Sequence, residues 1–228
     1  MLKKIFFAAA LLLASELIAK PVVIASIAPV EYLAKAVGGD KIEVQSLAKG
    51  DVHSYEPKPN DMKAVAKARI FIAAGLEFEE AWIPRFKASA KNLVVVQSDA
   101  KIAKLKEERG EQAEHDEKHE AHADPHVWLN PMLAITMARN ISDALIDMDK
   151  ANKDFYLENF QKLMNDLLAF DESAKNELAG LKNRKFVVYH PAWGYFAAHY
   201  DLEQISIERS GKEPKIDEMA STVKMIKD

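Results

Sequence analysis

The sequence predicts an α/β protein of two lobes with parallel sheets flanked by helices, joined by a long rigid helix, with the second lobe incomplete. Three observations predict this. Short apolar, β-branched runs alternate with amphipathic helical segments, as in βαβ units. One helical segment, 151–181, is much longer than the others. Strand and helix patterns resume after it and have not finished by residue 228.

The expected first lobe covers residues 20–150. Its first strand-like run, PVVIASI, is continuously apolar, which is typical of a buried parallel strand. The strands of this lobe are expected at 21–27, 42–47, 70–74 and 93–96. Helices are expected at 29–37 and 78–88, the latter with a kink at Pro84, and after Asn60, which can cap a helix.

Residues 107–124 have a different composition. They hold eight acidic residues, two basic residues and three histidines, and no large apolar residue. Such a segment cannot contribute to a core, so it is expected to form a mobile loop.

Two helices are expected after this loop. Asn130-Pro131 combines a favoured cap with a favoured first helical residue, and an apolar face then runs from Leu133 to Met148. The linking helix, 151–181, has apolar residues spaced by three or four and Gly180 near its end. At ~1.5 Å per residue it would be a rod of about 40 Å that holds two lobes at a fixed separation.

The expected second lobe covers residues 182–228. It has strand-like runs at 186–189 and 205–207, a helix at 192–199, and an amphipathic helix that opens at Ile216 and has no stop residue. Two short strands are too few for an independent covered sheet. The chain is therefore expected to be a truncated form of a longer protein.

The N-terminus and composition predict an exported protein. Lys3 and Lys4 precede a ten-residue apolar run, and Leu17-Ile18-Ala19 supplies a cleavage site, so residues 1–19 are expected to be a signal peptide. The run is too short to span a bilayer. The chain has no cysteine, which excludes disulfides, thiolate metal sites and an N-terminal lipid anchor. A net charge of −4 without a basic stripe argues against nucleic-acid binding.

Three of the seven histidines follow strands or precede a helix. They are His53, His126 and His190. Ligands of open α/β sheets bind outside the carboxyl ends of the strands, where loop side chains are held by a rigid scaffold. Imidazole suits Zn²⁺, which takes tetrahedral geometry. From the residues alone, a hydrogen-bonded or surface role is favoured for each histidine, since no short-range motif ties the three together.

The segments HSYEPKPNDMKAVAKA, DPHVWLNP and YHPAWGYFAAHYDL follow one another in this order. Together they resemble the substrate-binding proteins of high-affinity zinc ABC importers, in the wider family that binds zinc or manganese through two lobes joined by a rigid helix. The resemblance covers the chain from Pro21 to its end. It implies a periplasmic monomer that captures Zn²⁺ and delivers it to an inner-membrane ABC permease.

The resemblance also implies the ligands. His53, His126 and His190 match the family's metal-binding positions, and manganese-binding relatives usually carry Glu where His190 stands, so histidine there favours zinc. Family members usually add an Asp from a later part of the second lobe, which this sequence does not reach. The fourth position could be filled by water, a loop histidine, a missing residue or Asp51.

Further roles are expected around these ligands. A metal-bound histidine usually donates its other N–H to an acceptor, and Glu56 and Asp124 are near enough in sequence to accept it. The loop histidines His115, His119 and His122 are expected to capture zinc weakly, helped by the surrounding carboxylates. His199 is expected to be structural, and the aromatic residues near the ligands are expected to pack the interface between lobes. These are Trp128, Trp193, Tyr195 and Phe196.

Two other functions fit some of these features. Three histidines with an open fourth position are also the arrangement of a zinc hydrolase, but no recognised motif supplies a Glu as general base. Manganese binding in the same fold is the other alternative. The chain is expected to be a binding protein and not an enzyme.

Overall fold

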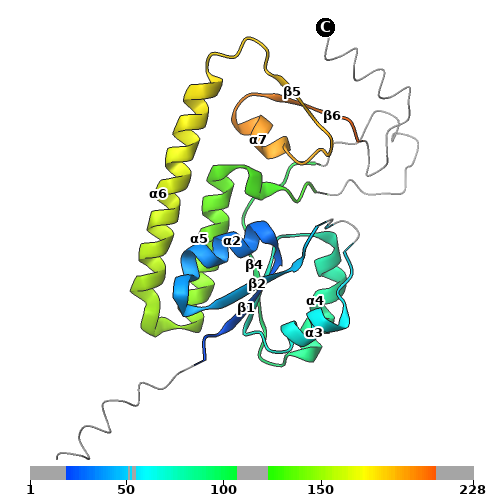
Figure 1. Ribbon diagram of the computed structural model, residues 1–228, viewed down its shortest axis with the longest axis vertical. Coiled ribbons are helices and arrows are strands. Elements are labelled where there is room, and N and C mark those ends of the chain that lie inside the picture. Colours follow the sequence, from blue (N-terminus) through cyan, green and yellow to red (C-terminus); the bar gives the residue numbers. More distant parts are fainter. Residues whose placement is uncertain (1–18, 51, 53–54, 107–122, 209–228) are drawn as a thin grey trace, which may run out of the picture.

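The computed structural model describes residues 19–50, 52, 55–106 and 123–208. It contains one four-stranded and one two-stranded sheet, and all strand pairs in both are parallel. Figure 1 shows the two sheets at opposite ends of the molecule, with the long helix α6 (Lys153–Leu178) running along one side between them. The predicted α/β class, with parallel sheets and a long joining helix, is confirmed.

The larger sheet has the strand order β2-β1-β3-β4. Its strands are β1 (Val22–Ile27), β2 (Glu43–Ala48), β3 (Ile70–Ala73) and β4 (Val94–Gln97). β1 is central, because Val23 pairs with Val44 on one side and with Ile70 on the other. β1 and β3 are buried almost throughout, which explains why their sequences are continuously apolar.

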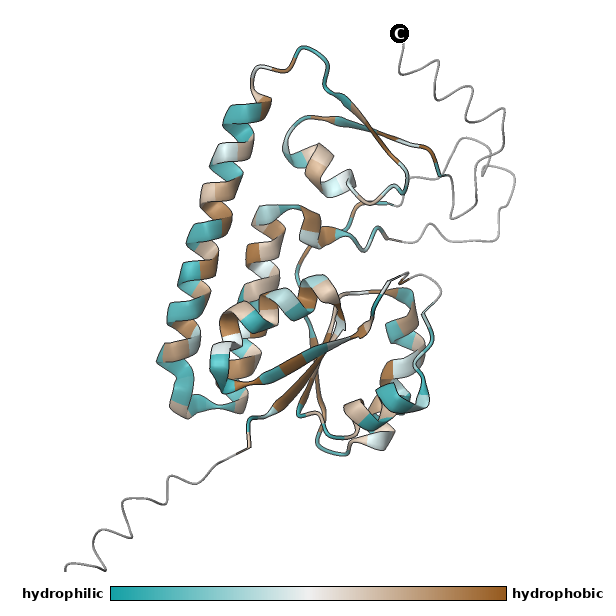
Figure 2. Cartoon of the chain, in the orientation of Figure 1, coloured by the Kyte–Doolittle hydropathy of each residue, from teal (hydrophilic) through white to brown (hydrophobic). Residues whose placement is uncertain are grey.

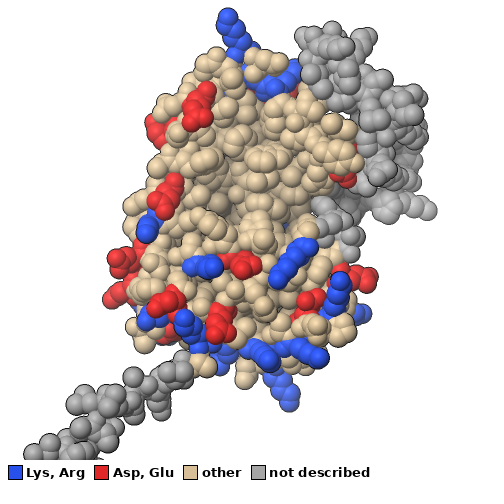
Figure 3. All heavy atoms as spheres, viewed as in Figure 1, with Lys and Arg blue, Asp and Glu red and all other residues tan. Residues whose placement is uncertain are grey.

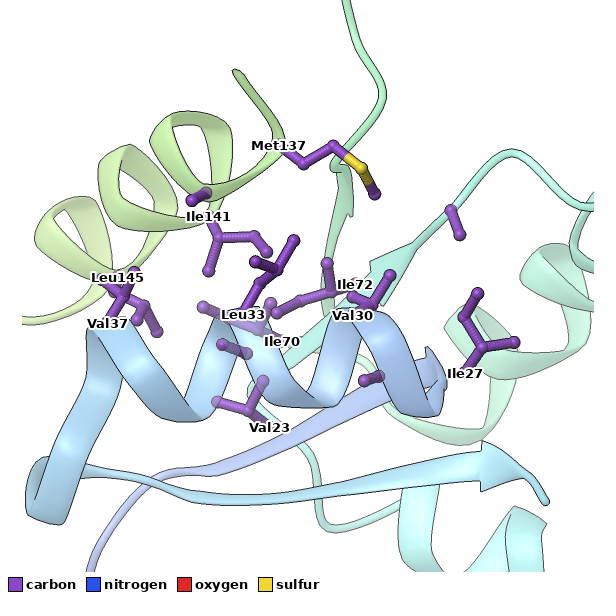
Figure 4. Close-up of a cluster of buried hydrophobic side chains, with 14 of the residues drawn as sticks. Val23, Ile27, Val30, Leu33, Val37, Ile70, Ile72, Met137, Ile141 and Leu145 are labelled. Carbon is purple, nitrogen blue, oxygen red and sulfur yellow. The ribbon is translucent and has the colours of Figure 1, made fainter. Parts of the chain in front are cut away.

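One face of this sheet is covered by α2 (Ala28–Gly38), α5 (Pro131–Met148) and α6. The core between the sheet and these helices is drawn in Figure 4. Side chains of strands β1 and β3 there point toward side chains of helices α2 and α5. The labelled residues are Val23, Ile27, Val30, Leu33, Val37, Ile70, Ile72, Met137, Ile141 and Leu145. The opposite face carries α3 (Pro59–Val65) and α4 (Glu77–Ser89), where Phe71 packs on Phe86 with ring centroids 5.0 Å apart.

The helix starts test the capping predictions. Asn130 caps α5 as predicted, since its side-chain oxygen accepts from Met132 N at 2.8 Å and Leu133 N at 3.3 Å. The prediction for Asn60 was wrong, because α3 begins at Pro59 with Lys58 as the cap residue. The helix starts earlier because proline suits its first turn and the Asp61 carboxylate accepts from Lys58 N at 2.8 Å.

Helix α6 has 26 residues, and its buried side chains change partners along its length. Tyr156, Phe160 and Leu163 belong to the core of the first sheet, whereas Asp171 is buried farther along. Figure 2 shows the alternation of hydrophilic and hydrophobic residues along the helix. The helix ends with Ala179 as its cap, one residue before the glycine that predicted its end.

The smaller sheet pairs β5 (Lys185–Val188) with β6 (Glu203–Ser206), with α7 (Gly194–His199) between them in sequence. β6 begins two residues before the expected Ile205. Helix α7 begins two residues later than expected, because the backbone N–H groups before it are used in a turn. Ala192 N donates to His190 O at 2.8 Å, and Trp193 N donates to Gln204 Oε1 at 2.7 Å. The helix predicted from Ile216 lies outside the described residues.

The surface charges are mixed on the face drawn in Figure 3, where lysines and arginines alternate with acidic residues around the larger sheet. Within the described ranges, no helix combines the length and the apolar character that crossing a membrane requires.

Candidate metal centre

Two of the three predicted ligands lie side by side. The His126 and His190 ring centroids are 5.2 Å apart, with the ring planes at 70° to each other. His126 precedes the short 3₁₀ helix η3 (Val127–Leu129) that leads into α5, and His190 follows β5 by two residues. The fold therefore brings imidazoles from the two sheet-bearing parts of the chain to one place.

His126 is buried and held by Asp124. The Asp124 Oδ1 atom accepts from His126 N at 2.9 Å and lies 2.7 Å from the ring Nδ1. Because one carboxylate oxygen holds both the backbone and the ring, the orientation of the imidazole is set by local chain geometry. In this arrangement Nε2 is the ring atom that would meet a metal ion, and Asp124 has the geometry of an outer carboxylate of a metal-bound histidine.

His190 has a matching carboxylate, which the sequence analysis missed. Its Nδ1 lies 3.0 Å from Oε2 of Glu208, whose side chain is 14% exposed. Glu208 follows β6 as His190 follows β5, and the carboxyl ends of parallel neighbours meet at one edge of a sheet. The position of Glu208 after a strand was the feature that could have identified it.

The other predicted site residues are not seen at this place. Glu56 is exposed on the segment before α3. His53 and Asp51, together with the loop histidines His115, His119 and His122, lie outside the described residues. Within the described ranges, no group of three or more His, Asp or Glu side chains could hold a metal ion. The three-histidine site therefore stays a prediction.

Of the four predicted interface aromatics, Trp128 contacts one of the imidazoles and Tyr195 joins α7 to the segments around Asp124. The Trp128 and His126 rings meet edge to face, with ring centroids 5.3 Å apart. The ring centroids of Trp193 and Phe196 are 5.5 Å apart. Tyr195 is 3% exposed, and its hydroxyl bonds to backbone atoms of Leu105 and Asp124. Desolvation by burial raises the pKa of Tyr195 to about 12, so its hydroxyl keeps its proton near neutral pH.

His199 lies in a different cluster, at the far end of α6. Its Nε2 is 2.6 Å from Oδ1 of Asp171, which also accepts from Tyr200 OH at 3.1 Å. Lys175 Nζ lies 2.7 Å from the other oxygen of the same carboxylate. Burial alone would raise the pKa of Asp171, but these hydrogen bonds outweigh it and hold the pKa below its usual range.

The arrangement favours a borderline transition metal over Mg²⁺ or Ca²⁺. Imidazole nitrogen is the characteristic ligand of Zn²⁺, and a carboxylate on the second ring nitrogen fixes the ring and increases its basicity. The two described histidines share this pattern, with Asp124 serving one and Glu208 the other.

Comparison with known proteins identifies the family of the chain. The family described as zinc-uptake complex component A, periplasmic (ZnuA), matches residues 23–228. The chain is 34% identical over 205 residues to a protein of Treponema pallidum (strain Nichols) whose name describes it as a metal-binding protein. The match covers 86% of this chain and 65% of that protein. It is 29% identical over 214 residues to the high-affinity zinc uptake system protein ZnuA of Bacillus subtilis (strain 168), covering 90% and 66%.

Solved structures agree on the fold. A crystal structure of ZnuA has 34% sequence identity and a TM-score of 0.81, covering 91% of this chain and 78% of that one. A ZnuA deletion mutant with zinc bound has 33% identity and a TM-score of 0.80, covering 91% and 77%. The chain spans about two thirds of the length of the two curated relatives. Their names denote metal-binding and zinc-uptake proteins and not enzymes.

Proposed function

Because the chain belongs to the ZnuA family of periplasmic zinc-uptake components, we propose that it captures Zn²⁺ in the periplasm and delivers it to an inner-membrane ABC permease. Residues 1–19 serve as a cleaved signal peptide, and the protein acts as a monomer. Residues 20–150 form the first lobe, 151–181 the linking helix, and 182–228 belong to the second lobe.

One observation carries this proposal. The His126 and His190 rings lie 5.2 Å apart, and the Nδ1 atom of each faces a carboxylate. Metal-bound histidines usually have a carboxylate on the second ring nitrogen. His199 also faces a carboxylate, so it is the pairing of two such rings at one place that favours a metal site. The proposed site consists of these two residues and His53, with Zn²⁺ as cargo.

Zinc is the proposed cargo in preference to manganese. Histidine at position 190 supplies a nitrogen ligand where a carboxylate would favour Mn²⁺. The zinc-bound ZnuA structure and the zinc-uptake protein of Bacillus subtilis support the same choice. Competition between the two metals tests it, and a protein that retains Mn²⁺ in the presence of equimolar Zn²⁺ would refute it.

The ligand assignment is tested by titration with a chromogenic zinc chelator. The proposed three-histidine site is called the tight site below. Changing His53, His126 or His190 to Ala should weaken zinc binding at this site by orders of magnitude. His199→Ala is the matched control, because its ring contacts Asp171 and lies in a separate cluster. Four variants with the same zinc affinity would contradict the assignment.

The acidic loop is proposed to collect zinc for the tight site. His115, His119 and His122 would bind it weakly, and the surrounding carboxylates would raise the local concentration of cations. Deleting residues 107–123 should remove the weak zinc equivalents and leave the tight site. Loss of the tight site would instead identify a loop histidine as the fourth ligand.

Export and delivery are tested in cells. The mature protein should begin near Lys20 and be released by osmotic shock, and it should co-purify with the permease of a zinc importer. An intact N-terminus in the cytoplasm would refute the proposed location. Normal zinc uptake at limiting zinc in cells that lack the protein would refute delivery.

A further inference from the structure

The residues on either side of the acidic segment 107–122 meet beside the candidate site, where a side chain of the second lobe joins them. Lys106 and Ala123 form an antiparallel bridge, and the next pair outward from the loop is Leu105 and Asp124. Asp124 N donates to Leu105 O at 2.9 Å. In a hydrogen-bonded antiparallel pair, the return bond would run directly from Leu105 N to Asp124 O.

The hydroxyl of Tyr195 takes the place of that return bond. Leu105 N donates to Tyr195 Oη at 2.9 Å, and the same hydroxyl donates to Asp124 O at 2.7 Å. Tyr195 is 3% exposed, so the two backbone groups that it serves have no easy access to water as a substitute. The hydroxyl therefore sets the separation of the two backbones at this point.

The position of Asp124 is transmitted directly to His126. The Asp124 carboxylate accepts from both His126 N and the ring Nδ1, so a displacement of Asp124 reorients the imidazole. No intervening side chain could absorb the displacement, because the two residues are separated only by Pro125.

The same tyrosine fixes the segment that follows His190. Tyr195 lies in α7, whose first residue, Gly194, follows the tight turn in which Ala192 N donates to His190 O. Asn130 Nδ2 donates to Tyr195 O at 3.4 Å, which adds a second polar contact between α7 and the start of α5. One residue thus holds the chain segments that carry both imidazoles.

We propose that Tyr195 is a positioning residue for zinc: its hydroxyl, inserted between Leu105 and Asp124, fixes Asp124 against His126 and holds the His190 segment beside it. The proposal rests on the proposed zinc function. It predicts that removing one buried oxygen atom, with no change in a ligand, weakens the tight site.

The first test compares two buried tyrosines changed to phenylalanine. Tyr195→Phe should weaken zinc binding by about 10-fold, the lower end of the usual effect of losing the outer partner of a metal ligand, because Tyr195 acts on that partner, Asp124, and not on His126 itself. Tyr156→Phe is the matched control, because Tyr156 is fully buried and its hydroxyl donates to Asp149 at 3.0 Å in the core of the first lobe. It should lose thermal stability but keep the zinc affinity of the unchanged protein.

The second test displaces the Asp124 carboxylate through a different contact. A Cβ at Gly194 would lie 3.1 Å from Asp124 Oδ2, so Gly194→Ala should push the carboxylate away and weaken zinc binding. Gly180→Ala is its control, since a Cβ there meets nothing within 4 Å. The visible absorption spectrum of the Co²⁺ complex should change for Tyr195→Phe and Gly194→Ala but not for the two controls, since it reports the geometry around the ion.

The outcomes separate this proposal from the proposed function. If the His126 and His190 variants lose zinc while Tyr195→Phe binds it as tightly as Tyr156→Phe does, the positioning role is refuted and the zinc site stands. If Tyr195→Phe does not fold, equal affinities of Gly194→Ala and Gly180→Ala refute the role, and a weaker Gly194→Ala supports it. If the unchanged protein binds no zinc, both proposals fail.

Discussion

Asp171 offers a sharp test of how the second lobe is attached to the linking helix. Its carboxylate lies on α6 and accepts from His199 and Tyr200, at the end of α7 and just after it. Changing Asp171 to Asn removes the charge and leaves one acceptor oxygen in place of two. The two groups at the end of α7 would then compete with Lys175 for a single neutral oxygen.

The magnitude follows from burial. Asp171 is 5% exposed, whereas the Lys175 side chain is 51% exposed, so the ion pair with Lys175 adds little. A hydrogen bond to a charged group contributes about 1.5–3 kcal/mol, so the partial loss of two such bonds should cost about 3 kcal/mol. In a chain of this size each kcal/mol lowers Tm by about 2–4 °C, so Tm should fall by roughly 6–12 °C.

Thermal unfolding followed by circular dichroism measures this effect. Asp166→Asn on the exposed side of the same helix is the control and should change Tm by no more than about 2 °C. Because the pKa of Asp171 is lowered in the fold, its stabilisation is present above about pH 4 and is lost as the pH falls through the folded value. The difference from Asp171→Asn should therefore shrink below about pH 4. Equal Tm values for the two variants at pH 7 would refute the reasoning.

Three further changes test the fold. Asn130→Ala removes the cap of α5 and should cost about 1 kcal/mol in urea unfolding. Phe71→Ala should cost about 3–5 kcal/mol because Phe71 is fully buried, whereas Phe170→Ala, at 54% exposure, should cost less than about 0.5 kcal/mol. Burial raises the pKa of Glu79, so its ionisation costs stability, and the stability of the unchanged protein relative to Glu79→Gln should fall as the pH rises above about 4.3. A difference that grows with pH would contradict this sign.

The elements that the sequence predicts well are those whose causes are local. Continuous apolar, β-branched runs predict β1 and β3 well, because strands buried on both faces need apolar residues at successive positions. Asn130-Pro131 starts α5 because both residues act within one turn of helix. The length of α6 follows from the regular spacing of its apolar residues. Those from Tyr156 to Leu163 pack into the core of the larger sheet.

The features that were missed depend on contacts between distant segments. Glu208 faces His190 because β5 and β6 are parallel neighbours, so its position two residues after the second strand was the one sequence feature that could have identified it. Tyr195 was expected to pack an interface, and the bridging role of its hydroxyl depends on Leu105 and Asp124, which lie far apart in the sequence. The start of α3 was misplaced because asparagine was favoured over the adjacent proline.

X-ray absorption at the zinc edge tests the central claim most directly. The protein loaded with one equivalent of Zn²⁺ should show imidazole nitrogen at about 2.0–2.1 Å, and the number of imidazoles should fall by one in both His126→Ala and His190→Ala. The His199→Ala spectrum should match that of the unchanged protein. A shell made of oxygen alone, or an imidazole count that neither His126→Ala nor His190→Ala alters, would contradict the account.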